Sequence, residues 1–152
     1  MEDEWESEGA SPEYTDEVLK HFIEPHNVGV ISDADGIGQI GDPTCGDVFV
    51  MFIKVAGGRL ADVKYLVRGC PAAIATCSAL SIIATGKTLD EAMKLCDDDL
   101  ARELGGLPTE KLHCSNWAAT VLHLAIDDYK KHRPNLHDWR SLYAQRGGGG
   151  SN

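Results

Sequence analysis

The surroundings of three of the five cysteines favour sulfur or metal chemistry: Cys45, Cys70 and Cys114. The first two are each next to a glycine, which lets backbone approach a bound group closely. Pro71 suits the first position of a helix, so Cys70 is the predicted N-cap residue. The positive end of a helix dipole lowers the pKa of a thiol. Cys70 is therefore expected to favour the thiolate, the form that binds metal and attacks sulfur.

Asp47 and His113 are candidates to complete a metal site beside these cysteines. Asp47 offers a hard oxygen next to soft thiolates, a poor match for an iron–sulfur site, so it would loosen a bound cluster. His113 directly precedes Cys114, so that either side chain could coordinate, or His113 could assist Cys114 as a nucleophile. The spacing alone does not show that His113 and Cys114 lie close to the other two cysteines.

A predicted hairpin brings Cys45 close to Cys70. Residues 48–55 and 60–67 are β-rich, and Gly57-Gly58 supplies the positive φ angles of a two-residue turn. This turn places Val48 opposite Val67, Val50 opposite Tyr65, and Phe52 opposite Val63. Continued without a bulge, the same register places the two cysteines opposite each other, with Cβ atoms about 5 Å apart. They could then share a metal or small cluster, or form a disulfide.

The other two cysteines are expected to be structural. Cys77 follows Cys70 by seven residues in a nearly all-apolar helical stretch, which favours core packing. Cys96 stands beside three aspartates and has no evident partner. No C-x-x-C occurs, so the usual zinc-finger spacing is missing.

The order of the predicted elements is one helix, then strands, then a run of helices. Thr15 caps the first helix and Pro25 ends it, after which comes a loop or short edge strand. After the hairpin, helices are predicted at 72–85, from a capping box at 88–91, at 98–104, and to about residue 131. His113 and Cys114 are placed just before the last helix. This order predicts an α+β fold, a small antiparallel three-stranded sheet with helices packed on one face.

Length and charge narrow the classes of protein. The chain has 152 residues, the size of one domain, and 43% hydrophobic residues. Its net charge of −10 argues against nucleic acid, because phosphate binding depends on Lys and Arg. No apolar run is long enough to span a membrane. An odd number of cysteines without a signal peptide predicts a reducing, cytoplasmic location.

Three regions differ in composition. Residues 1–13 are expected to be a disordered acidic arm, 14–143 the folded domain, and 144–152 a flexible Gly-rich tail.

Three cysteine motifs, in order, resemble those of the IscU/NifU N-terminal scaffold family. Residues 43–47 (PTCGD) resemble its C-G-D motif, 68–75 (RGCPAAIA) its G-C-x-x-A-I-A motif, and 111–116 (KLHCSN) its K-x-H-C-S motif. Residues 14–29 resemble its opening segment, Y-[ST] followed by P-x-N-V-G. The resemblance covers about residues 14–131.

The resemblance implies a scaffold on which a labile [2Fe–2S] cluster is built from iron and sulfur. It implies that Cys45, Cys70 and Cys114 bind iron and sulfide, with His113 or Asp47 as the fourth ligand. It implies a cysteine desulfurase partner, which delivers persulfide first onto Cys114. The finished cluster then passes to recipient apo iron–sulfur proteins.

Departures and alternatives limit this resemblance. Residues 107–111 (LPTEK) differ from the L-P-P-V-K segment read by a dedicated Hsp70-type chaperone, which argues against that partner. A zinc-dependent sulfurtransferase of the SufU type would use the same three thiols and Asp47. That branch carries an insertion between its second and third cysteines, for which this sequence leaves no room.

A structural zinc domain is a third interpretation. The sequence leaves open whether the protein forms a homodimer and whether zinc occupies it when isolated.

Overall fold

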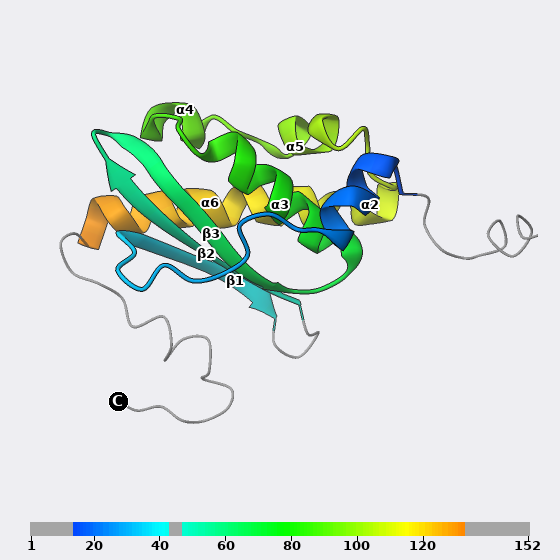
Figure 1. Ribbon diagram of the computed structural model, residues 1–152, viewed down its shortest axis with the longest axis horizontal. Helices are drawn as coiled ribbons and strands as arrows, with labels where there is room; N and C mark the ends of the chain where they lie inside the picture. The colour runs from blue at the N-terminus through cyan, green and yellow to red at the C-terminus, as the bar shows by residue number, and fades with distance from the viewer. Residues whose placement is uncertain (1–13, 43–46, 133–152) are drawn as a thin grey trace, which may run out of the picture.

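The computed structural model describes residues 14–42 and 47–132, which form a small sheet covered by helices on one side (Figure 1). The strands are β1 (Gly36–Asp42), β2 (Asp47–Ala56) and β3 (Arg59–Arg68), antiparallel in the order β1-β2-β3. The predicted α+β fold with a three-stranded antiparallel sheet is confirmed. The acidic arm and the Gly-rich tail lie outside the described residues.

The helices follow the predicted order and their caps. They are α2 (Asp16–Ile23), α3 (Pro71–Ala84), α4 (Leu89–Met93), α5 (Asp97–Glu103), the short 3-10 helix η1 (Thr109–Lys111) and α6 (Leu112–His132). The Thr15 hydroxyl accepts the Val18 N–H at 3.1 Å, and Thr88 forms the predicted capping box with Glu91. Cys70 is the N-cap of α3, with Pro71 at its first position. None of the helices in the described ranges is long and apolar enough to cross a membrane.

The hairpin register differs by one residue from the predicted one. The turn itself is as expected, since Gly57 and Gly58 have φ angles of +62° and +76°. A β-bulge between Lys54 and Val55 then shifts the pairing. Beyond the bulge the opposed pairs are Phe49–Val67, Met51–Tyr65 and Ile53–Val63, so the predicted pairs Val48–Val67, Val50–Tyr65 and Phe52–Val63 are wrong.

The Asp35 side chain accounts for the bulge. Its carboxylate accepts the Val55 N–H at 2.7 Å, and its backbone N–H donates to the Ile53 carbonyl at 2.8 Å. A bulge leaves a strand N–H without its ladder partner, and here a carboxylate from the segment before β1 replaces that partner. Nothing local to the hairpin sequence signals this contact.

Strand β2 is buried on both faces, which positions the helices that carry the candidate site. Phe49, Met51 and Ile53 join the main core with buried residues of α3 and α6. Val48, Val50 and Phe52 form a second cluster with Ile31 and Ala34, from the segment that precedes β1. Alternation of apolar and polar residues is therefore missing from β2, and the sequence did not determine which β2 residues face the helices.

Helix α6 lies directly against β1. A Cβ atom at Gly36 or Gly38 would overlap a backbone carbonyl of α6, that of Ala125 or of Val121 respectively. The Asp128 carboxylate also accepts the Ile37 N–H at 2.9 Å. Close approach of backbones thus fixes α6, and its first turn, relative to the sheet.

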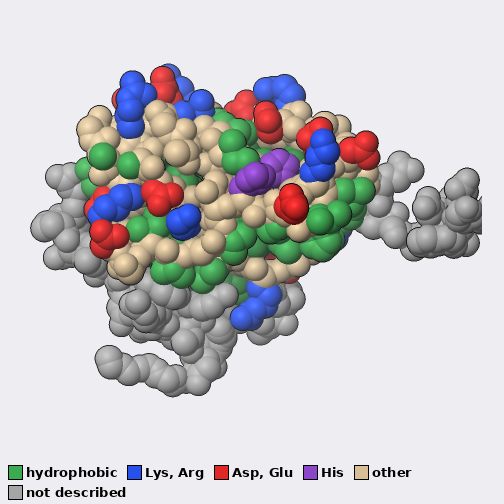
Figure 2. All heavy atoms as spheres, in the orientation of Figure 1, with side chains coloured by type: hydrophobic (Ala, Val, Ile, Leu, Met, Phe, Trp, Pro, Cys, Tyr) green, Lys and Arg blue, Asp and Glu red, His purple; other side chains and the backbone are tan. Residues whose placement is uncertain are grey.

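Helix α2 packs on α3 through one buried side chain. Val18 meets Ala75 and Ala79 of α3, together with Leu104. Leu19, Phe22 and Ile23 remain exposed, and Figure 2 shows apolar surface over this helix. The apolar periodicity of α2 therefore includes more side chains than the fold buries.

Candidate functional site

Cys70 and Cys114, which are 44 residues apart in sequence, meet where α3 and α6 begin. Their Sγ atoms are 3.8 Å apart. Two thiolates bound to one tetrahedral metal ion at about 2.3 Å would lie about 3.8 Å apart. The pair is therefore already spaced to share a metal ion.

The start of α3 supports this meeting. The Thr76 hydroxyl donates to the Ala73 carbonyl at 3.0 Å and lies 3.5 Å from the Cys114 carbonyl. Cys114 is buried, with 2% of its surface exposed, whereas Cys70 is half-buried. Cys114 is thus held in the core, whereas Cys70 is partly accessible to solvent.

The two thiols differ in protonation because they share one hydrogen bond. The Cys114 S–H, partly offset by burial, lowers the pKa of Cys70 to about 5, with further help from N–H groups of Ala73 and Ala72 and from Lys111. The same interaction, together with burial, raises the pKa of Cys114 far above its ordinary value. Cys70 is therefore the thiolate of the pair, as its N-cap position predicts.

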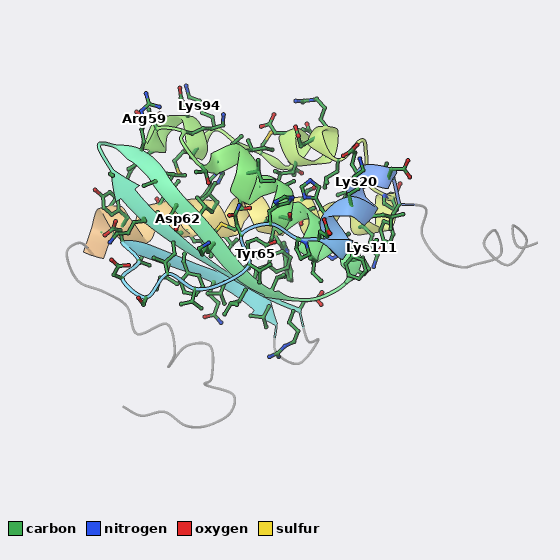
Figure 3. All side chains as sticks on the ribbon, in the orientation of Figure 1. Lys20, Arg59, Asp62, Tyr65, Lys94 and Lys111 are labelled. Carbon is green, nitrogen blue, oxygen red and sulfur yellow. The ribbon has the colours of Figure 1, made fainter. Side chains whose placement is uncertain are left out.

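Lys111 is a site residue that the sequence reasoning missed. The Cys70 thiolate raises the pKa of Lys111, and Lys111 in turn helps to lower that of Cys70. Figure 3 shows Lys111 at the end of the molecule where α2 lies and α3 begins. Its signal in the sequence is its position two residues before His113, at the start of the KLHCSN segment.

The Asp47 carboxylate lies beside Gly69, at the mouth of the hairpin. A Cβ atom at Gly69 would lie 3.4 Å from Asp47 Oδ1. The charge of Asp47 also contributes to the raised pKa of Cys114. Asp47 is therefore close to the sulfur pair, and Gly69 leaves space for it.

His113 lies in the first turn of α6, whereas the sequence predicts it just before that helix. Its Nε2 atom is 3.6 Å from the Cys114 sulfur. The side chain itself is exposed. His113 thus adds a nitrogen to the two sulfur atoms.

Cys45 lies outside the described residues. The prediction that Cys45 directly faces Cys70 required a hairpin without a bulge. The bulge found between β2 and β3 therefore removes the basis of that prediction. Within residues 14–42 and 47–132, no three His, Cys, Asp or Glu side chains are arranged to hold a metal ion. The described part of the chain contributes one close pair of sulfur ligands, with a nitrogen and a carboxylate nearby.

The other two cysteines are separate from this pair. Cys77 is buried in α3, as expected, and burial raises the pKa of its thiol. Cys96 is exposed at the N-cap of α5, where its N–H and its thiol both approach Asp99 Oδ2, at 3.0 and 3.4 Å. Its structural role is therefore to cap a helix and not to fill the core.

The arrangement suits binding of soft metal ions. It combines a preformed thiolate, a second sulfur whose proton a metal ion would displace, and a nearby lysine that favours negative charge. A hard carboxylate beside soft sulfur donors favours a site that exchanges its ligands.

The sequence of this chain is similar to those of several known proteins. Residues 13–135 match the NifU-like N terminal domain family. The chain is 52% identical over 116 residues to the iron-sulfur cluster assembly scaffold protein IscU 1 of Archaeoglobus fulgidus, covering 76% of each chain. It is 45% identical over 119 residues to the scaffold protein IscU of Aquifex aeolicus, covering 77% of this chain and 76% of that one.

A solved structure shows the same fold. The N-terminal NifU-like protein of Brucella abortus superimposes with a TM-score of 0.62 at 15% identity, over 77% of this chain and 94% of that one. The sequence match spans the strands and helices that carry Cys70, Cys114, His113 and Asp47. The chain therefore belongs to the NifU-like N terminal domain family.

Proposed function

We propose that this protein is a scaffold on which a labile [2Fe–2S] cluster is assembled and then passed to apo-proteins. Cys45, Cys70 and Cys114 bind the cluster, and Asp47 or His113 supplies the fourth ligand. Iron and sulfide are cargo here, and the protein provides ligands and access. The 3.8 Å separation of the Cys70 and Cys114 sulfur atoms is the observation that carries the proposal.

Two lines of support bear on the ligands. The pair has the spacing of two thiolates on one metal ion, and the scaffold proteins of Archaeoglobus fulgidus and Aquifex aeolicus match the chain over its folded body. For Cys45 the support is the C-G-D motif that ends at Asp47, together with the position of Asp47 next to Gly69.

Sulfur arrives as a persulfide from a cysteine desulfurase. The Cys114 thiolate attacks the outer sulfur atom of the donor's persulfide, which leaves a persulfide on Cys114 and a thiolate on the donor. An external electron donor then supplies two electrons, which release sulfide and restore the thiolate. In the metal-free pair Cys70 is the thiolate and Cys114 holds the proton, so that proton must leave before Cys114 attacks.

Anaerobic reconstitution with ferrous iron and sulfide tests the ligand set. Wild-type protein is expected to acquire a visible absorption band and two irons and two acid-labile sulfides per cluster. Cys45→Ser, Cys70→Ser and Cys114→Ser are each expected to abolish this band. Cys96→Ser, which removes an exposed thiol that caps α5, is the matched control and should reconstitute fully.

A second experiment identifies the sulfur acceptor. The protein is incubated with a cysteine desulfurase and cysteine, and the cysteine that gains one sulfur atom is located by mass spectrometry. Addition to Cys114 supports the proposed acceptor, whereas addition to Cys70 would transfer that role to the thiolate of the metal-free pair.

The SufU-type sulfurtransferase is the other function consistent with these ligands. Bound zinc, sulfur accepted on Cys114 and no cluster after reconstitution would establish it in place of the scaffold. Either activity needs reduced thiols, which fits the cytoplasmic location expected from the cysteine content.

A further inference from the structure

A line of three aromatic rings connects the core to the cysteine pair. Phe49 of β2 is 1% exposed, and its ring centroid is 5.7 Å from that of Trp117, at an interplanar angle of 73°. The Trp117 ring is in turn 5.9 Å from the His113 ring, at 82°. Both contacts are edge-to-face, one of the two arrangements that aromatic pairs prefer.

Helical geometry explains why Trp117 reaches His113. The two residues are four apart on α6, so their side chains lie on the same face one turn apart. Trp117 is half-buried against the core, whereas His113 is exposed. An exposed histidine without such a contact would sample several side-chain rotamers.

The orientation of His113 matters because of its other neighbour. Its Nε2 atom is 3.6 Å from the Cys114 sulfur, which is 3.8 Å from that of Cys70. Adjacent residues of a helix point about 100° apart, so this approach requires one particular direction of the imidazole. The indole edge-to-face contact selects that direction.

We propose that Trp117 is a positioning residue, which holds the His113 imidazole against the Cys114 sulfur and so slows loss of the assembled cluster. The effect on the cluster rests on the proposed scaffold function, whereas the positioning of His113 does not. Trp117 acts only through His113, and this dependence separates positioning from simple packing.

The first test uses metal-free protein and measures the χ1 rotamer of His113 by three-bond NMR couplings. Wild type and Trp117→Phe, which keeps an aromatic ring, are expected to hold a single rotamer. Trp117→Leu, which keeps an apolar side chain, is expected to show rotamer averaging. Val121→Ala, a buried truncation on the same helix, is the control and should leave the rotamer fixed. Averaging in wild type, or a fixed rotamer in Trp117→Leu, would overturn the positioning role.

The second test measures the rate of cluster loss under anaerobic conditions after reconstitution. Trp117→Leu is expected to lose its cluster about threefold to tenfold faster than wild type, the factor that one aromatic pair supplies. In a His113→Ala background the same substitution should change nothing further. Additive effects of the two substitutions would refute action through His113.

The two experiments fail separately. Wild-type protein that assembles no cluster would refute the scaffold function, while the NMR couplings of metal-free protein would still decide whether Trp117 positions His113. An unchanged rate of cluster loss in Trp117→Leu, with averaged His113 rotamers, would refute the link between positioning and retention.

Discussion

At the scale of single residues, Cys70 and Cys114 act as one unit. Their sulfur atoms share a hydrogen bond, so lowering the pKa of one thiol raises that of the other. Lys111 and the first N–H groups of α3 place the negative charge on Cys70. The half-buried sulfur is thus ready to bind metal, while the buried one keeps its proton until a metal ion displaces it.

This coupling predicts how Cys70 reacts with pH. Because its pKa is about 5, the thiolate persists as the pH falls from 8 to about 6 and is protonated only below about 5. Alkylation of metal-free protein by iodoacetamide, followed at the Cys70 peptide by mass spectrometry, should keep its rate across that upper range.

Cys114→Ala removes the S–H donor and should move the Cys70 pKa up, toward its ordinary value of 9.0. Alkylation of Cys70 at pH 6 should then slow markedly, while Cys77→Ala leaves it unchanged. Equal pH profiles for wild type and Cys114→Ala would show that the sulfur pair does not share a proton.

Asp47 is predicted to make the cluster easier to lose. Its hard oxygen lies beside soft sulfur donors, so Asp47→Ala should slow cluster loss, by about threefold to tenfold. The measurement is the decay of visible absorption under anaerobic conditions with a chelator. Asp62→Ala is the charge-matched control, because Asp62 lies near the turn at the other end of the hairpin and should leave the decay rate unchanged. Faster decay in Asp47→Ala would contradict the prediction.

At the scale of elements, local signals were sufficient for the caps. Thr15 and the Thr88–Glu91 box act within one helical turn, so their residues alone predict them. Pro71 likewise located the start of α3 and made Cys70 its cap. The largest contribution to the lowered pKa of Cys70, from Cys114, does not follow from this start, whereas the N–H groups of Ala73 and Ala72, which also help to lower it, do.

Contacts between distant segments could not be predicted in this way. The bulge at Val55 depends on Asp35, twenty residues away, and it changes which β2 residues face the helices. Helix α6 begins earlier than the sequence predicts, because η1 leads directly into it, so His113 and Cys114 fall in its first turn. The meeting of Cys70 with Cys114 depends on the packing of α3 and α6, to which their spacing of 44 residues gives no clue. The proposed role of Cys45 as a ligand rests on its motif alone.

The bulge contact yields a prediction about stability. Asp35→Ala should lower the free energy of unfolding by about 1–3 kcal/mol, because the Val55 N–H loses its acceptor. Urea denaturation measures the change. Asp33→Ala is the matched control, because Asp35 and Asp33 both pair with Lys54, at 3.6 and 3.0 Å, but Asp33 does so at the exposed surface, and its loss should cost clearly less than that of Asp35. Similar losses in the two variants would mean that the ion pairs with Lys54, and not the bulge, account for the effect.

At the scale of the whole molecule, the folded unit is proposed to be residues 14–143. The family match covers residues 13–135, and the described core lies within it. Protein truncated to residues 14–143 should therefore unfold within about 4 °C of the full chain, a difference of under about 1 kcal/mol. It should also reconstitute the same cluster. A larger drop in melting temperature would show that residues 1–13 or 144–152 belong to the fold.

The size of the core determines what metal removal should do. Buried side chains from β2, β3, α3, α4 and α6 form one continuous cluster, and a second cluster covers the opposite face of the sheet. Small zinc domains unfold without metal because they lack such a core, and binding then supplies the folding free energy. Cys70 and Cys114 lie at the starts of α3 and α6, and both helices contribute buried side chains to the first of these clusters.

Chelation should therefore release cargo without unfolding the chain. Protein treated with a strong chelator should keep its far-UV circular dichroism and a cooperative thermal transition, shifted down only by the binding free energy of the lost metal. Cys70→Ser, which lacks one ligand, should show no shift, and this control separates loss of cargo from direct effects of the chelator. A scaffold should keep its helical signal in both proteins, so loss of this signal in wild type alone would contradict the prediction. Loss of helix in both metal-free proteins would instead show that bound metal holds the starts of α3 and α6 together, as a structural zinc domain requires.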